Sequence, residues 1–267
     1  MNLAVVGHVE WIEFVRVEAV PKPGEIVASH ETWAEPAGGG GVASVELARL
    51  DGKVALYCLL GGDDLGSKSR VRLEAAGVRV YSPQSDGPQR RGFCYLDEVG
   101  ERTITVIGQK PRPPGGEGSL PWEELDSADG VYFTAGDAEA VRQARRARVL
   151  VATARELPTL HAAGVELDAL VASGEDDAER YQAGDLDPPP RLVVSTAGSL
   201  GGWAQPGGPY KPAVAPGPFE DAYGAGDCFA AGLTYALAKG MEIPDALAFA
   251  SDRGALALTR RGAGLTG

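Results

Sequence analysis

Short runs of apolar and β-branched residues alternate along the chain with segments of helical spacing. The apolar runs cover residues 3–6, 54–60, 131–133, 149–152, 170–172 and 192–195. They are continuous, which is typical of strands covered on both faces. The helical segments between them cover residues 42–50, 68–76, 138–146 and 176–181. This repeated strand–helix order predicts a parallel sheet with helices on both faces.

Three other segments predict a second, smaller sheet. Residues 11–17 mix apolar and charged side chains at strand spacing, and residues 93–96 and 102–107 flank a turn at 97–100. We expect these strands to be antiparallel and to lie outside the main sheet, within about residues 9–36 and 88–109. A small sheet in such a place commonly covers a ligand. The alternative is that these strands extend one edge of the main sheet.

Size and composition fit one folded domain over residues 1–267. The chain is 44% hydrophobic and 23% charged, as in ordinary globular proteins, and it is too short for two full α/β domains. Its 37 acidic and 25 basic residues give a net charge of −12. Non-specific nucleic-acid binding is therefore excluded, because such binding requires cations that neutralise phosphates.

Neither export nor membrane insertion is expected. The apolar runs are only long enough for strands, and no basic segment follows Met1, so we predict a cytoplasmic protein without a membrane span. Cys58, Cys94 and Cys228 lie far apart and form no Cys-x-x-Cys pair. This spacing predicts buried free thiols and argues against disulfides or a thiolate zinc site.

The strongest chemical signal is the segment Asp221-Ala222-Tyr223-Gly224-Ala225-Gly226-Asp227, which precedes an Ala- and Leu-rich helical stretch. Small residues at a helix start leave backbone N–H groups open to an anion, and the helix dipole favours negative charge there. The carboxylate of Asp227 could accept a proton from an attacking hydroxyl. This combination suits phosphoryl transfer to an alcohol. The alternative is a Gly-rich turn in which Asp227 only offsets the helix dipole.

Competing motifs are incomplete. Residues 61–66 followed by Lys68 resemble a Walker A loop, but the lysine is one place late, and Asp63 and Asp64 would repel phosphates. No Gly-x-Gly-x-x-Gly follows the first strand and no Gly-x-Ser-x-Gly is present, so a dehydrogenase and a serine hydrolase are not supported. The histidines lack metal-ligand spacing and are interpreted as structural or exposed.

The segment from Asp221 to Asp227 resembles the second signature of the PfkB (ribokinase-like) family of carbohydrate and nucleoside kinases. Other features of that family occur in the same order over nearly the whole chain. They are residues 38–41, 62–66, 100–103, 196–201 and 255–263. The resemblance implies a ribokinase-like three-layer α/β/α domain with a mostly parallel central sheet and a small β-sheet lid.

The resemblance also implies where the phosphate donor, ATP, binds. Asp227 would be the catalytic base. The backbone of three residues would form the anion hole: Gly224, Ala225 and Gly226. The nucleotide would border Thr196, Gly198 and Gly201, with Ser251 near the adenine.

Two cation sites are implied as well. Mg²⁺ would accompany ATP through water beside Glu175 and Asp176, whose carboxylates are ligands of the kind that Mg²⁺ prefers. A solvated acidic helix start is the alternative for these two residues. An activating monovalent cation, K⁺ for example, would lie near Asp221, Arg260 and Gly262.

The sugar end departs from the pattern of ribokinase-like proteins. An Asn and an Asp that hold sugar hydroxyls in those relatives correspond here to Glu10 and Ile12, and an Asn after the glycine run corresponds to Val42. Ribose itself is expected to be a poor substrate, because buried hydroxyls would lose their partners.

Four residues are predicted to contact the substrate: Glu10, Gly38, Gly39 and Arg91. Glu10 would pair with hydroxyls or a cationic group, and Arg91, together with Arg90, could meet a second phosphate. A solvated charge is the alternative in each case.

The sequence thus predicts an ATP-dependent phosphotransferase that phosphorylates an alcohol group of a sugar, a sugar derivative or a nucleoside. A homodimer through the lid is expected, with no nucleic-acid or membrane partner. The alternative is a catalytically weak relative that binds or senses a metabolite. Retention of Asp227 and its glycines favours the enzyme.

Overall fold

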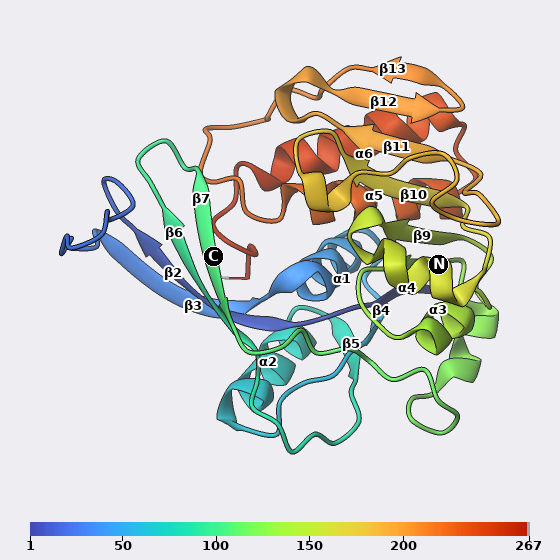
Figure 1. Ribbon diagram of the computed structural model, residues 1–267, viewed down its shortest axis with the longest axis horizontal. Helices are drawn as coiled ribbons and strands as arrows, with labels where there is room; N and C mark the ends of the chain where they lie inside the picture. Colours follow the sequence, from blue (N-terminus) through green and yellow to red (C-terminus); the bar gives the residue numbers. More distant parts are fainter. Residues whose placement is uncertain (266–267) are drawn as a thin grey trace.

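The computed structural model describes residues 1–265, which fold around two sheets (Figure 1). In the larger sheet the strands follow the order β13-β12-β11-β10-β9-β8-β1-β4-β5. From β11 to β5 all neighbours pair in parallel, and β12 and β13 continue the β11 edge as antiparallel strands. The strand bounds are β1 Leu3–Val6, β4 Val54–Tyr57, β5 Val78–Tyr81, β8 Gly130–Phe133, β9 Leu150–Thr153, β10 Ala169–Ser173, β11 Val193–Thr196, β12 Gly202–Gln205 and β13 Gly208–Tyr210.

Helices cover both faces of this sheet. Alternate residues of β1 show the division, because Leu3 and Val5 belong to one buried cluster whereas Ala4 and Val6 belong to another. The first cluster includes side chains of α1 (Gly38–Asp51), α2 (Asp64–Ala75), α5 (Ala225–Ala238) and α6 (Ile243–Ala257). The second includes side chains of the 3₁₀ helix η1 (Trp122–Ser127), α3 (Ala138–Ala144) and α4 (Leu157–Ala163). The predicted three-layer α/β/α architecture is confirmed.

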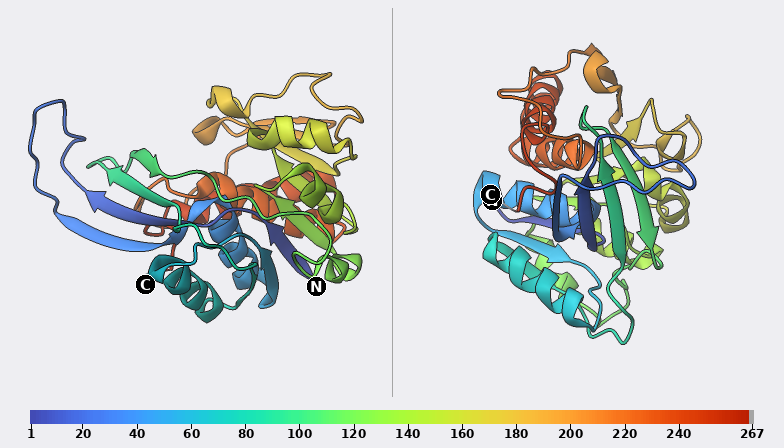
Figure 2. Two further views of the ribbon diagram at one scale, coloured as in Figure 1. Left: turned by 60° about the horizontal axis from the view of Figure 1, so that its bottom comes forward. Right: turned by 90° about the vertical axis from the view of Figure 1, so that its left-hand side faces the viewer.

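The smaller sheet, called here the small sheet, has the order β3-β2-β6-β7 and projects from one side of the molecule (Figure 2). Its strands are β2 Glu10–Arg16, β3 Glu31–Ala37, β6 Arg91–Leu96 and β7 Arg102–Ile107. The prediction of a sheet separate from the main one is confirmed, and the alternative of an extra edge is wrong. The pairs β2/β3 and β6/β7 are antiparallel, but β2 and β6 pair in parallel, so the expected antiparallel arrangement does not hold for that pair.

The small sheet has one buried face and one open face. Ile12, Phe14, Cys94 and Leu96 are buried in a cluster with Tyr223 of the segment before α5. Since side chains alternate along a strand, their neighbours in sequence point to the opposite face.

Several local predictions need correction. Residues 176–181 contain only the 3₁₀ turn η3, Asp177–Glu179, because the Asp176 side chain accepts a hydrogen bond from Ala178 N and residue 180 is extended. Asp competes in this way with helix formation. The first helix begins earlier than expected, at Gly38, so the glycine run forms its first turn. The strands β5, β12 and β13 were not predicted, and β3 falls in the predicted lid range of about 9–36 without having been predicted as a strand.

Cys58, Cys94 and Cys228 are buried free thiols, as predicted. Within residues 1–265, no helix has the length and apolar character needed to cross a membrane.

Candidate active site

The candidate site lies where the first turn of α1 meets the ends of β1 and β8. After β1 the chain continues to His8, whose carbonyl accepts a hydrogen bond from Gly40 N at 3.0 Å. After β8 comes Thr134, whose N–H donates to Val6 O at 2.8 Å. Ligands of open α/β sheets bind outside the carboxyl ends of parallel strands. The fold therefore puts these residues at the edge where a ligand is expected.

The N-terminus of α5 opens into this region. Its N-cap Gly224 has a left-handed φ of 74°, and no side chain caps the helix. A Cβ added at the exposed Gly226 would meet nothing within 4 Å. First-turn N–H groups of an α-helix have no acceptor within the helix. The backbone of residues 224–226 thus offers uncapped donors beside open space, which is what an anion hole requires.

Asp227 lies in the same first turn and reaches the glycines of α1. A Cβ on Gly39 would lie 2.9 Å from Asp227 Oδ1 and 2.5 Å from Thr134 Oγ1, so only glycine leaves room for both side chains. Desolvation is the main cause that raises the pKa of Asp227 from 3.8 to about 6, and the negative charge of Glu179 adds to it. At neutral pH the carboxylate is ionised yet more basic than an ordinary Asp, as suits a general base.

His8 is a site residue that sequence reasoning missed. It is buried, and its Nε2 accepts a hydrogen bond from Gly39 N at 3.4 Å. Desolvation lowers the pKa of His8 well below its ordinary value, and the positive charges of Lys110 and Arg90 lower it further. The ring is therefore neutral and shapes the glycine turn. The role of His8 was not predicted, because its contact with Gly39 joins residues 31 positions apart and no local pattern links them.

Glu10 lies beside His8 but already has a partner. Its Oε1 is 3.0 Å from Arg90 Nε and 3.6 Å from His8 Nε2. Desolvation raises the pKa of Glu10, although Arg90 opposes the shift. The charge that was expected to select a cationic ligand is thus neutralised within the protein by Arg90.

Of the other sugar-end residues, Gly38 and Gly39 lie beside His8 and Glu10, but Arg91, Ile12 and Val42 do not present side chains to the site. Arg91 lies on the open face of the small sheet, where its Nη2 is 2.6 Å from Glu13 Oε1. Ile12 is fully buried in the small-sheet cluster, and Val42 packs so closely that a Cβ on Gly224 would lie 2.8 Å from it. Ile12 and Val42 are therefore packing residues of the site's framework.

A second missed group follows β7. Lys110 Nζ donates to Glu156 Oε1 at 2.7 Å and to Thr134 O at 3.3 Å. Arg112 Nη1 donates to Glu156 Oε2 at 2.6 Å and to Gly136 O at 2.8 Å. These partners are 24 to 46 residues apart in sequence, so no local pattern links them.

The predicted nucleotide residues lie at and just after the end of β11 and in the middle of α6. Thr196 ends β11, and the 3₁₀ turn η4 (Gly198–Leu200) follows, with left-handed φ values of 50° at Gly198 and 88° at Gly201. Ser251 lies on α6, where its buried Oγ has no hydrogen-bond partner among the described residues. This region leads from the sheet edge towards α6.

The acidic residues near β10 form an ion-paired cluster. Arg155 Nη2 is 2.5 Å from Asp176 Oδ2 and 2.6 Å from Glu179 Oε1. Glu175 turns instead towards Gly198, where a Cβ would lie 3.3 Å from both of its carboxylate oxygens. Over residues 1–265, no group of three or more His, Cys, Asp or Glu side chains forms a ready metal site.

The residues expected near a monovalent cation bond to each other or to other protein groups. Asp221 is fully buried and accepts hydrogen bonds from Tyr223 N and Gly262 N, each at 2.8 Å. Arg260 pairs with Glu46 at 2.5 Å. The K⁺ prediction therefore rests on the sequence resemblance alone.

Comparison with known proteins agrees with this geometry. Residues 1–157 and 144–266 match the pfkB family of carbohydrate kinases. An ATP-dependent ribose-1-phosphate kinase of Halopiger xanaduensis is 32% identical over 285 residues, covering 96% of this chain and 92% of the relative.

Solved structures show the same fold. A ribokinase of Cryptococcus neoformans in complex with ADP has a TM-score of 0.74 at 20% identity, covering 98% of this chain and 95% of that one. An adenosine kinase of Sinorhizobium meliloti has a TM-score of 0.77 at 18% identity, with coverages of 98% and 95%. The chain belongs to the pfkB family of carbohydrate kinases, and it is an ATP-dependent kinase of a sugar or nucleoside.

Proposed function

We propose that this kinase phosphorylates a pentose that already carries a phosphate, with ribose-1-phosphate as the substrate. The main support is the 32% identity with a ribose-1-phosphate kinase across 96% of the chain. The burial of Ile12 and Val42 adds to it, because a site without these polar partners is poorly suited to free ribose.

Asp227 would accept the proton of the attacking sugar hydroxyl. The residue lies in the first turn of α5, and its raised pKa of about 6 brings its basicity close to neutral pH. The uncapped N–H groups of residues 224–226 would hold the transferring phosphoryl group as charge builds up on it. Base and anion hole thus come from one helix start, so their relative positions are fixed by the backbone.

ATP would extend from that helix start towards Thr196, Gly198, Gly201 and Ser251. The unpartnered Oγ of Ser251 supports this placement, because a buried hydroxyl without a partner is costly unless a ligand satisfies it. Gly198 and Gly201 have positive φ, so the backbone can turn sharply after β11, where it would border the nucleotide.

Mg²⁺ would be held through water by the carboxylates of Glu175, Asp176 and Glu179. Their oxygens are of the ligand type that Mg²⁺ prefers, and this ion usually keeps several waters and binds one or two carboxylates together with substrate phosphates. When bound, it neutralises charge on the phosphates of ATP. Arg155, which pairs with Asp176 and Glu179, would hold those two carboxylates in place.

The small sheet would act as a lid that excludes water from the reacting groups. A side chain of the small sheet already contacts the segment before α5, because Arg102 of β7 donates a hydrogen bond to Ala222 O. Closure of β7 would therefore act on the segment that carries Asp227.

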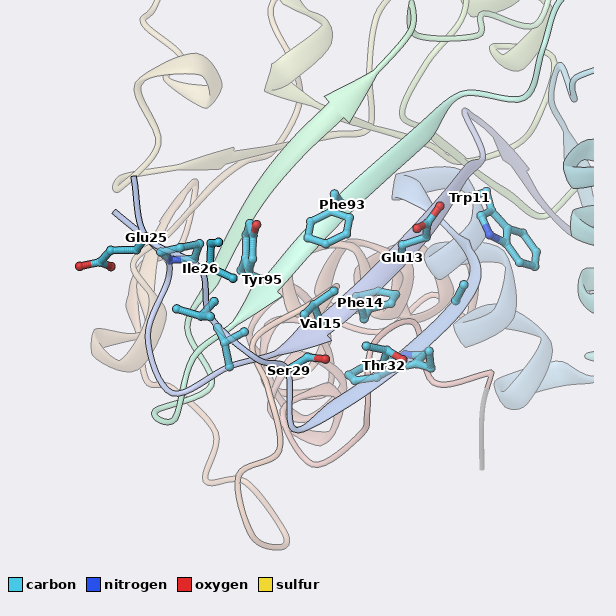
Figure 3. A pocket seen from close by; sticks show the side chains of 15 residues that line it. Trp11, Glu13, Phe14, Val15, Glu25, Ile26, Ser29, Thr32, Phe93 and Tyr95 are labelled. Atoms are coloured by element: carbon cyan, nitrogen blue, oxygen red, sulfur yellow. The ribbon is translucent and has the colours of Figure 1, made fainter. Parts of the chain in front are cut away.

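The open face of the small sheet would pair with a second copy of the chain. It holds a hollow of about 810 Å³ whose lining includes Trp11, Val15, Ile26, Phe93 and Tyr95 (Figure 3). The loop between β2 and β3 contributes Ile26, which is fully exposed. Apolar surface of this kind marks an interaction site, and a two-fold dimer would bury the same face on both copies.

A coupled assay of ADP release tests the proposed function. Ribose-1-phosphate, ribose-5-phosphate, ribose and adenosine are compared at equal concentrations, and Asp227→Asn supplies the background rate. We expect the highest kcat/KM with ribose-1-phosphate. Equal or faster turnover of ribose or adenosine would refute the proposed substrate.

A further inference from the structure

Lys110 and Arg112 share one buried counter-ion. Both bind Glu156, whose side chain is only 3% exposed, through its two different oxygens. Two cations balanced by one carboxylate leave one positive charge over. By contrast, the charge of Arg90 is balanced by Glu10, and Arg155 pairs with two carboxylates, those of Asp176 and Glu179. The pair Lys110/Arg112 thus carries excess positive charge within the site.

Lys110 also has a donor to spare. A lysine ammonium carries three N–H donors. One donates to Glu156 and one to the carbonyl of Thr134, and no acceptor for the third is found within residues 1–265. The Lys110 side chain is 19% exposed, so the spare donor is partly shielded from solvent but still accessible to a ligand.

The position of this charge connects it to the reacting groups. Lys110 donates a hydrogen bond to the carbonyl of Thr134. The side-chain oxygen Oγ1 of Thr134 and Oδ1 of Asp227 both lie beside Gly39. The positive charge of Lys110 also acts on His8 and Asp227. A small ligand seated over Gly39 with a hydroxyl at Asp227 would therefore have its other end within reach of Lys110.

We propose that Lys110, supported by Arg112, binds the phosphate that the sugar substrate carries before the reaction, and that Glu156 positions both cations. This inference rests on the proposed function and assigns its specificity to these residues. The Lys110 ammonium would donate to a phosphate oxygen, and the excess charge would offset part of the phosphate's charge. A sugar without the phosphate would leave this charge without a ligand.

Isothermal titration without ATP tests binding directly. Ribose-1-phosphate and ribose are titrated into the wild type, Lys110→Met, Lys110→Arg and the control Lys68→Met, whose lysine is exposed on α2. Because one partner of a shielded charge pair is removed, Lys110→Met should weaken ribose-1-phosphate binding roughly 30- to 5,000-fold, which corresponds to about 2 to 5 kcal/mol. Lys110→Arg should recover part of this loss, and Lys68→Met should match the wild type.

Steady-state kinetics distinguish loss of phosphate recognition from general damage to the site, because general damage would lower kcat/KM equally for both sugars. For Lys110→Met, kcat/KM should fall strongly with ribose-1-phosphate but less than about threefold with ribose, so the ratio of the two should collapse. Thermal melts show whether each variant is folded, and Arg112→Met provides a second, milder variant because Lys110 still holds Glu156.

The outcomes separate this inference from the proposed function. If Lys110→Met binds ribose-1-phosphate as tightly as Lys68→Met, or loses the same factor with both sugars, Lys110 does not recognise the phosphate. If the wild type binds no pentose phosphate, the inference is also wrong. If the wild type binds ribose-1-phosphate in a Lys110-dependent way but does not turn it over, the inference stands and the proposed function fails.

Discussion

Replacing Asp227 with Asn should strongly slow catalysis and stabilise the protein at the same time. The carboxyl has a pKa of 3.8 in ordinary surroundings and about 6 in the folded chain, so folding favours its protonated form. The contribution of this carboxyl to the free energy of unfolding is therefore fully present below about pH 4, and it is lost as the pH rises through 6. The shift of about two pKa units corresponds to roughly 3 kcal/mol at pH 7.5.

An amide at position 227 carries no charge and avoids this cost. It also gives up the favourable interaction of a carboxylate with the helix dipole, worth about 0.3 to 1 kcal/mol. We therefore expect Asp227→Asn to raise the free energy of unfolding by about 1 to 3 kcal/mol at pH 7.5 and to match the wild type below pH 4. Turnover should fall by about 10² to 10⁴, as is typical when a general base is lost.

Asp245→Asn is the matched control. Asp245 is likewise the third residue of its helix, α6, but it is exposed and far in sequence from the glycine loop. This change should lower stability slightly at pH 7.5 and leave turnover intact. Urea unfolding at pH 3.5 and 7.5 measures the free energies of unfolding, and ADP release at pH 7.5 measures turnover. Near-normal turnover by Asp227→Asn, or a stability loss at pH 7.5 like that of Asp245→Asn, would refute the assigned role of Asp227.

Four further results are expected. The wild-type kcat/KM should fall about tenfold per pH unit below an apparent pKa near 6, since protonated Asp227 cannot act as a base; a flat profile between pH 5 and 7 contradicts this. Gly226→Ala should keep the melting temperature but lower kcat/KM, because its methyl group enters the open space of the anion hole; unchanged kinetics would argue against that hole. Phe93→Glu should convert a dimer to monomers in light scattering, whereas Lys68→Glu should not; a wild-type monomer would refute pairing through the small sheet. Glu46→Ala should cost about 3 to 5 kcal/mol in urea unfolding, because it leaves Arg253 and Arg260 without their buried partner; a cost below 1 kcal/mol would show that these cations relax into solvent.

Local sequence signals were sufficient for the elements with strong periodicity and for the start of α5. Continuous apolar runs predicted β1, β8, β9, β10 and β11, and Asp227 with its glycines was predicted from adjacent residues. In β5, Val78–Tyr81, the buried valines alternate with Arg79 and the half-buried Tyr81, so the strand lacks a continuous apolar run. The strands β12 and β13 contain glycine and proline, which are poor strand formers.

The sugar end could not be predicted, because its contacts join distant segments. Lys110 and Glu156 are 46 residues apart, and no local spacing brings them together. Arg90 and Arg91 are adjacent, yet Arg91 begins β6 and points to the open face with Glu13, whereas Arg90 pairs with Glu10. Only the pairing of β2 with β6 decides which arginine belongs to the site.

The proposed activity is tested most directly by a ³¹P NMR time course of the purified protein with ATP, Mg²⁺ and ribose-1-phosphate. We expect loss of the γ-phosphate signal of ATP together with a new phosphate ester on the sugar, while the original 1-phosphate signal persists in a doubly phosphorylated pentose. Release of inorganic phosphate without a new sugar ester, or transfer to free ribose in preference to ribose-1-phosphate in a mixture of the two, would contradict it.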